Sequence, residues 1–192
     1  MKAAQILFKI LIVYCALYST IWLHEFGHAV FYFVYGCKSN LFQLHVPFSF
    51  AAASPGVLDT ACCSSLTCVQ HISAALGGIL VNIVLAIGIY LVLPKCKLYP
   101  LVCLFAAAFL LSNLVEAASY VTLGNIFPMG DILAVKEYCP VLRIPLGIVG
   151  IGIIAFIARA LQIIPKTMRV GMIIFTLATA FCMFGMRFLF AS

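Results

Sequence analysis

The sequence has very little charge. Only 8% of its 192 residues are Asp, Glu, Lys or Arg, whereas 66% are hydrophobic. A water-soluble domain of this length needs far more polar surface, so this shortage excludes a soluble globular domain and predicts a multi-pass integral membrane protein. The net charge of +6 is spread over short connecting segments. We interpret it as a signal of membrane topology, and we expect a lipid bilayer and no nucleic acid as a partner.

The chain is also short for more than one domain. We expect a single integral membrane domain over residues 1–192, with a core at about 5–135 and two extra helices at about 144–190. The apolar run after Met1 and Lys2 resembles a signal peptide, but its removal would cut into the helix that carries the central motif described below. We therefore interpret this run as a retained membrane helix.

The nine cysteines lack the spacing of a metal site, because most are scattered through apolar runs. We expect most of them to be small, buried, hydrophobic side chains. Four cysteines fall in one connecting segment, where the sequence permits a disulfide but leaves its pairing open. They are Cys37, Cys62, Cys63 and Cys68.

Five hydrophobic segments have the length of a membrane-spanning helix, which needs about 20 apolar residues. They lie at roughly 5–35, 70–93, 99–123, 144–164 and 169–190. After the first of them, Leu44–Val46 and Phe48–Phe50 alternate between apolar and polar residues, and Ser54-Pro55-Gly56 is typical of a turn. We predict an all-α polytopic membrane protein with about five transmembrane helices and a small membrane-associated β-hairpin after the first.

The most informative motif is His24-Glu25-Phe26-Gly27-His28, inside the first apolar segment. Two histidines four residues apart lie on one face of an α-helix, so both imidazoles can reach one metal ion. A glutamate after the first histidine can take a proton from water bound to that ion. Polar groups are costly at membrane depth, where they usually mark function.

Further polar residues follow in the later segments. Asn82 is a buried amide in the second segment, close to Gly77-Gly78, and Glu116 lies within the third. The stretch from Gly124 to Asp131 contains Gly and Pro and cannot continue as a regular helix. Irregular backbone next to a carboxylate inside a membrane bundle is where a site can be built.

Three motifs, in this order, resemble those of the site-2 protease family of intramembrane zinc metalloproteases. The first is the His-Glu-x-x-His sequence. The second runs from Gly77-Gly78 to Asn82, with Gly78 where the family commonly has proline. The third is Asn125-x-x-Pro128-x-x-Asp131, in which the spacing to the aspartate is short and Ile132 replaces the usual glycine.

The resemblance implies a site built around one catalytic Zn²⁺ per chain. His24, His28 and Asp131 would be its ligands, with water in the fourth position, and Glu25 would act as general base and then as proton donor. Asn82, Asn125 and Pro128 would contact the substrate, with Asn82 orienting its backbone or stabilising the oxyanion. The predicted hairpin near Leu41–Phe50 would offer a strand edge to an unwound substrate. Apart from the resemblance, Glu116 is costly in a membrane helix, so we expect it to support a histidine ligand or to pair with a basic residue.

By the same resemblance, the chain is expected to be an intramembrane zinc endopeptidase. It would hydrolyse peptide bonds in or near transmembrane segments of other membrane proteins, as in regulated intramembrane proteolysis. The chain has no soluble domain to recruit substrates, so selection would come from the membrane region or from a recruiting partner protein.

Other functions are compatible with the sequence. In a membrane zinc protease of the prenyl-protein type, Glu116 would replace Asp131 as the third ligand. A zinc transporter or another non-proteolytic zinc-binding membrane protein would need more ligands along a pathway, and the chain has only four histidines and five acidic residues. An inactive relative would only bind membrane segments.

The orientation in the membrane stays open. With five spans, the side that holds the N-terminus carries seven basic residues: Lys2, Lys9, Lys95, Lys97, Arg159, Lys166 and Arg169. The other side carries four: Lys38, Lys136, Arg143 and Arg187. This bias favours a cytoplasmic N-terminus, whereas the family resemblance implies that the motif-bearing helix enters from the outer face.

Overall fold

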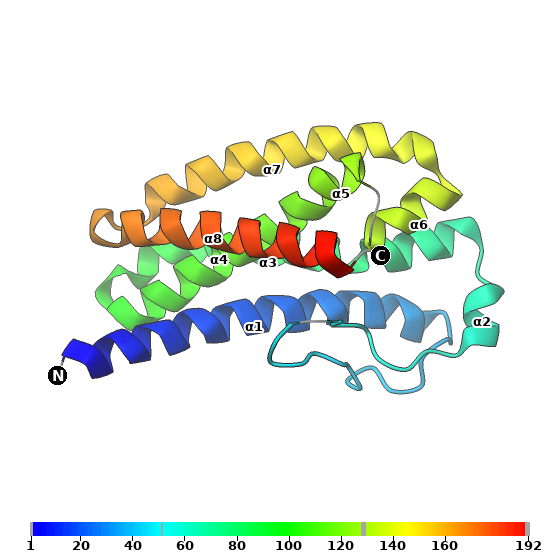
Figure 1. Ribbon diagram of the computed structural model, residues 1–192, viewed down its shortest axis with the longest axis horizontal. Coiled ribbons are helices and arrows are strands. Elements are labelled where there is room, and N and C mark those ends of the chain that lie inside the picture. The colour runs from blue at the N-terminus through cyan, green and yellow to red at the C-terminus, as the bar shows by residue number, and fades with distance from the viewer. Residues whose placement is uncertain (1, 51, 128–129, 191–192) are drawn as a thin grey trace.

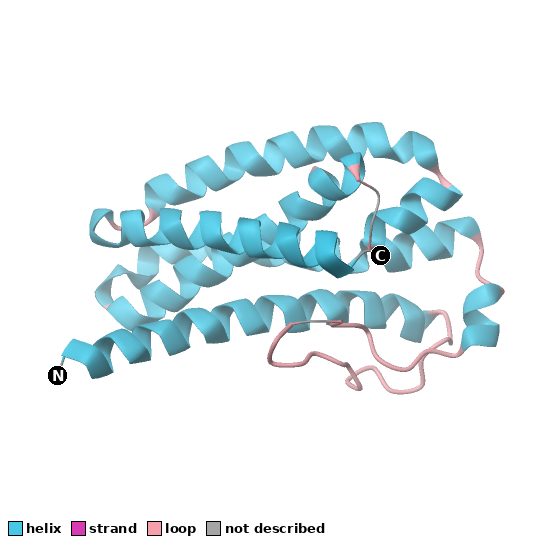
Figure 2. Cartoon of the chain, viewed as in Figure 1, coloured by secondary structure: helices cyan, strands magenta, loops and turns pink. Residues whose placement is uncertain are grey.

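The computed structural model describes residues 2–50, 52–127 and 130–190. Long helices lie side by side along one axis, and short helices and loops join them at the two ends (Figure 1). In chain order the elements are α1 (Lys2–Val34), α2 (Thr60–Ser64), α3 (Cys68–Val92), η1 (Leu93–Leu98), α4 (Pro100–Val121), α5 (Leu123–Ile126), α6 (Asp131–Tyr138), η2 (Pro140–Leu142), α7 (Arg143–Ile163) and α8 (Lys166–Phe190). The all-α prediction is confirmed for these residues (Figure 2).

Helix α4 forms the centre of the bundle and packs against α1, α3, α7 and α8. Its residues are buried almost without interruption from Leu104 to Ser119, apart from Phe105. Small side chains on several faces, such as Ala106, Ala107 and Ala117, let neighbouring helices approach on all sides. The other long helices expose large apolar side chains to the outside.

The structure contains four helices, rather than five, that are long and apolar enough to cross a membrane, among the residues it describes. They cover Ala3–Val34, Cys68–Lys95, Pro100–Ile126 and Pro140–Ile163. The described residues do not support a fifth span at 169–190, although α8 is helical there.

The predicted β-hairpin is absent from the described residues (Figure 2). The segment after α1 runs as a loop along that helix, and among its described residues one bridge pairs His45 with Ser54. The Tyr14 and Tyr18 hydroxyls donate hydrogen bonds to the Phe48 and Val46 carbonyls, at 2.8 and 3.1 Å. These carbonyls are therefore satisfied by α1 side chains rather than by a second strand, and the predicted strand edge near Leu41–Phe50 is not formed.

One disulfide and two hydrogen bonds hold this segment in its folded shape. Cys37 forms a disulfide with Cys62, which resolves the pairing that the sequence left open, while Cys63 and Cys68 are free thiols. The buried Lys38 ammonium donates hydrogen bonds to the Gln43 and Pro55 carbonyls, at 2.9 and 2.6 Å. The loop is thus a defined part of the structure at the C-terminal end of α1.

Candidate metal centre

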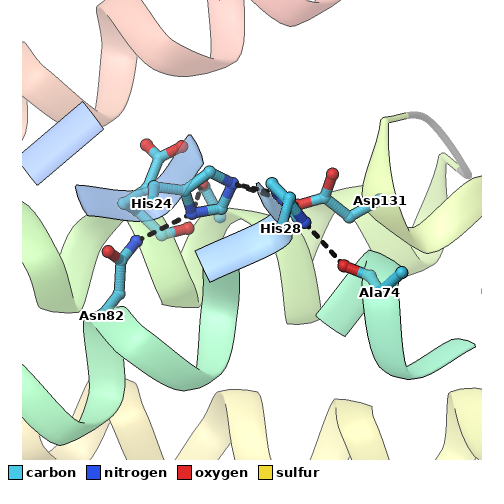
Figure 3. Close-up of polar contacts among 7 residues, drawn as sticks. His24, His28, Ala74, Asn82 and Asp131 are labelled. Atoms are coloured by element: carbon cyan, nitrogen blue, oxygen red, sulfur yellow. Dashed lines mark hydrogen bonds and ion pairs between the residues drawn. The ribbon is translucent and has the colours of Figure 1, made fainter. Parts of the chain in front are cut away.

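Helix α1 presents His24 and His28 on the face that packs against α3, one helical turn apart (Figure 3). His24 is 1% exposed and His28 is 5% exposed. Their Nε2 atoms lie 3.0 Å apart, so the two nitrogens face the same point. The spacing predicted this convergence, because residues four apart on a helix share a face.

Asp131 lies beside the two histidines in space, although it is distant from them in the sequence. Its Oδ2 lies 3.1 Å from His24 Nε2 and 3.4 Å from His28 Nε2. Asp131 is the first residue of α6, and its side chain is 17% exposed. Burial acts to raise the pKa of this carboxyl, but the charges and hydrogen bonds of His28 and His24 outweigh it and hold the pKa well below its usual range.

The residue before this ligand must be glycine. Gly130 has a φ of +55°, a conformation that residues with a side chain rarely adopt. A Cβ atom there would also lie 3.1 Å from Cε1 of Tyr120. The ring of Tyr120 in turn stacks on His24, with 5.1 Å between the ring centroids and 5° between the planes. Tyr120 therefore packs between the histidine ligand and the start of α6, a role that the sequence did not indicate.

The three ligand atoms have the separations that a tetrahedral zinc site requires. Zinc ligands lie about 2.0–2.1 Å from the ion, so two of them at the tetrahedral angle are about 3.3–3.4 Å apart. The observed triangle of 3.0, 3.1 and 3.4 Å is close to this value. Two imidazoles and one carboxylate are also the donor types of a catalytic zinc site with an open fourth position. The residues present therefore fit the ion.

Helix α3 closes the centre from one side, where Gly78 leaves room for the histidine rings. A Cβ atom on Gly78 would lie 2.6 Å from His28 Nε2 and 2.7 Å from His24 Nε2. One residue earlier, a Cβ atom on Gly77 would lie 2.6 Å from the Gly27 carbonyl oxygen. The small residues of the second motif thus bring the α3 backbone against α1 at the metal ligands.

We expect Gly78→Ala to weaken zinc binding by at least about 100-fold, more than loss of a residue that only orients a ligand. The added methyl group would meet both ligand nitrogens and push the rings out of position. Gly88→Ala is the matched control on the same helix, because a Cβ atom there meets nothing within 4 Å. Zinc affinity measured by chelator competition in detergent checks this. Equal affinities for the two variants would contradict the placement of Gly78.

The second nitrogen of each histidine also has a partner (Figure 3). His28 Nδ1 lies 2.7 Å from the Ala74 carbonyl oxygen. A carbonyl can only accept, so Nδ1 donates its proton and Nε2 of a neutral His28 keeps a lone pair for a metal. His24 Nδ1 lies 3.1 Å from the amide nitrogen Nδ2 of Asn82, a completely buried residue whose Oδ1 has no hydrogen-bond partner.

The tautomer of His24 depends on how this amide is turned. With the amide oxygen toward Nδ1, Asn82 accepts the Nδ1 proton and His24 Nε2 is free to ligate. With the amide nitrogen toward Nδ1, as the structure has it, the proton sits on Nε2 and ligation is blocked. A ligated His24 therefore requires the amide turned over, so that Asn82 accepts the Nδ1 proton and orients the ligand.

We expect Asn82→Leu to lower zinc affinity by about 10–100-fold, the usual cost of losing the partner of a histidine ligand. Asn113→Leu is the control, because Asn113 is also a fully buried amide but donates to Thr20 and to the Phe109 carbonyl, away from the ligands. The comparison uses chelator competition at equal folded fractions. Loss of affinity in both variants alike would show a general packing defect instead.

The remaining predicted residues lie in different surroundings. Glu25 is 7% exposed and within electrostatic range of His24, His28 and Asp131. Glu116 is buried on α4, and among the described residues only His24, His28 and Asp131 form a group with ligand atoms close enough for one ion.

Asn125 contacts α7 instead of the ligands. Its amide nitrogen donates to the Arg143 carbonyl at 2.5 Å, and its Oδ1 accepts from Arg143 Nε at 3.1 Å. The Arg143 guanidinium also donates to the Asn125 carbonyl. These bonds join α5 to the start of α7. Pro128 lies outside the residues that the structure describes.

Comparisons with protein-family models, with curated proteins and with solved structures gave no match to this chain.

Proposed function

We propose that this chain is a multi-pass integral membrane protein and an intramembrane zinc endopeptidase. The observation that carries the proposal is the triangle of His24, His28 and Asp131 ligand atoms, buried among helices long and apolar enough to cross a membrane. A catalytic zinc site has three such ligands and one open position. The resemblance of the three sequence motifs to site-2 proteases agrees with this donor set.

The proposed reaction is hydrolysis of a peptide bond. A bound zinc ion supplies Lewis acidity toward the scissile carbonyl and a lowered pKa of the attacking water. Glu25 takes one proton from that water, whose oxygen forms a bond to the carbonyl carbon. Glu25 then gives the proton to the leaving nitrogen as the C–N bond breaks, so the products are a carboxylic acid and an amine.

The substrates of this reaction would be transmembrane segments of other proteins. His24 and His28 lie within the membrane-length part of α1, which a soluble substrate does not reach. The scissile peptide must leave its helix, because helical amides are hydrogen-bonded and shielded. The exposed edge of the centre is at Asp131, and we infer that the unwound peptide enters there.

Two alternatives are less well supported. A site of the prenyl-protease type needs Glu116 in the ligand group, and among the described residues the group contains Asp131 instead. A zinc transporter needs successive sites along a path, whereas a single group of this kind lies in the described part of the chain.

The proposal is tested with purified protein reconstituted in lipid vesicles that carry the single-span membrane proteins of the expression host. We expect new termini within hydrophobic segments by mass spectrometry, which disappear with a zinc chelator and return with added zinc. If the substrates stayed intact in the presence of fully zinc-loaded protein, the proposed protease activity would be wrong. The chain would then be a non-proteolytic zinc-binding protein.

A further inference from the structure

The two ends of the helix bundle differ in what they carry. One end holds the start of α1, the connection from α3 to α4 and the turn from α7 to α8, and we call it the N-terminal end (Figure 1). The other holds the loop after α1, α2, α6 and the start of α7, and we call it the disulfide end (Figure 1). The metal centre is near the disulfide end, since Asp131 begins α6 there.

The disulfide of Cys37 with Cys62 indicates the chemistry of the compartment at its end. Cys37 is completely buried, and its carbonyl accepts a hydrogen bond from the Asp59 amide at 2.9 Å. The bridge is therefore integrated into the folded loop. Disulfides form and persist in oxidising compartments and are rare in the cytosol.

The charges give an independent indication. Seven of the eleven basic residues belong to the N-terminal end: Lys2, Lys9, Lys95, Lys97, Arg159, Lys166 and Arg169. The acidic residues of the connecting segments and short helices all belong to the disulfide end: Asp59, Asp131 and Glu137. One of the four basic residues of that end, Lys38, is buried against backbone carbonyls. An excess of Lys and Arg marks the cytoplasmic side of a membrane protein.

We propose that the disulfide end faces the oxidising, non-cytoplasmic side of the membrane, so that the centre works in the half of the bilayer next to that side. Cysteine pairing and charge distribution are different observations, and both point in this direction. The orientation is opposite to the one that the site-2 protease resemblance implies for the motif-bearing helix.

The position of the histidines along α1 gives the depth. At 1.5 Å per residue, His28 is about 9 Å and His24 about 15 Å from the end of α1 at Val34, whereas about 33 Å separate His24 from Lys2. A hydrocarbon core is about 30 Å thick. This part of the inference rests on the proposed function: the substrates would be membrane proteins whose spans unwind in their non-cytoplasmic half.

The test of orientation needs no substrate, so it can be read even if the protein is not a protease. Two tagged versions of the otherwise wild-type chain are made. One carries an epitope tag at the N-terminus, and the other carries it after Val57, which is 74% exposed in the loop. Spheroplasts of expressing bacteria are probed with an impermeant antibody before and after permeabilisation. We expect the loop tag to be bound in intact spheroplasts and the N-terminal tag only after permeabilisation.

Two substitutions give the same readout without an insertion. In intact spheroplasts, Val57→Cys should be labelled by an impermeant maleimide more strongly than the untagged parent chain. Lys95→Cys, whose position is exposed in η1, should show such additional labelling only after the cells are lysed. Denatured protein is alkylated with and without prior reduction. Reduction should expose two additional thiols in the wild type and no additional thiol in Cys37→Ser. Labelling of Lys95→Cys from outside, labelling of both sites, or thiols that are all free would overturn the proposal.

Discussion

Replacing Asp131 by alanine is expected to remove bound zinc, from about one ion per chain to less than about 0.1, when metal is measured in detergent-purified protein. The substitution deletes one of three protein ligands, and zinc sites need this number to hold the ion with an open fourth position. Even loss of a residue that only orients a ligand typically costs 10–100-fold in affinity, and loss of a ligand should cost more. The Oδ2 atom within 3.1 and 3.4 Å of the two histidine nitrogens would be gone.

Glu116→Ala is the control for this experiment. Glu116 is buried, as an acidic ligand would be, but it is outside the group of converging ligand atoms. We expect this variant to keep its zinc. If Glu116→Ala lost its zinc while Asp131→Ala kept it, Asp131 would not be the third ligand. Glu116 would then take that place, as in a site of the prenyl-protease type.

Replacing Glu25 by glutamine is expected to leave zinc binding intact and to lower the cleavage rate by about 10²–10⁴-fold, the usual contribution of a general base. Glutamine has the shape of glutamate but cannot take a proton from water. Glu25 is not one of the three ligands, so the metal content should not change. The measurement pairs zinc analysis with fragment formation in reconstituted vesicles.

Glu137→Gln serves as the matched control, because it removes the same charge from an exposed position on α6. It should cleave at the wild-type rate. If Glu25→Gln cleaved at the wild-type rate with zinc bound, Glu25 would not be the base. Loss of zinc in Glu25→Gln would instead give that side chain a structural role.

Local sequence patterns predicted the parts of the site that lie close together in the chain. The spacing of His24 and His28 fixed a shared helix face, and the structure shows their nitrogens 3.0 Å apart. Asp131 was different, because more than one hundred residues separate it from His24. The Gly- and Pro-containing stretch before it indicated that a site could be built there, and the resemblance to a family gave Asp131 its role as a ligand. The structure shows why the position is special, since Gly130 with positive φ precedes α6 and lets the helix begin at Asp131, whose carboxylate faces the histidines.

Other parts could not be read from the sequence because tertiary contacts decide them. The Ala74 carbonyl that fixes His28 and the Tyr120 ring that stacks on His24 give no sequence signal. The alternation around Val46 and Phe48 predicted a hairpin, but tyrosines of α1 take the backbone carbonyls there. The last segment was counted as a span by its hydrophobicity, and it is helical, but it is not among the four membrane-length helices of the described residues.

X-ray absorption at the zinc edge of purified wild-type protein shows directly whether His24, His28 and Asp131 hold zinc. Coordination by these three residues predicts about one zinc per chain in a shell of nitrogen and oxygen atoms at about 2.0–2.1 Å, with no sulfur. A sulfur shell at about 2.3 Å, which would place the ion on cysteines, or folded protein without zinc after incubation with the metal, would contradict it.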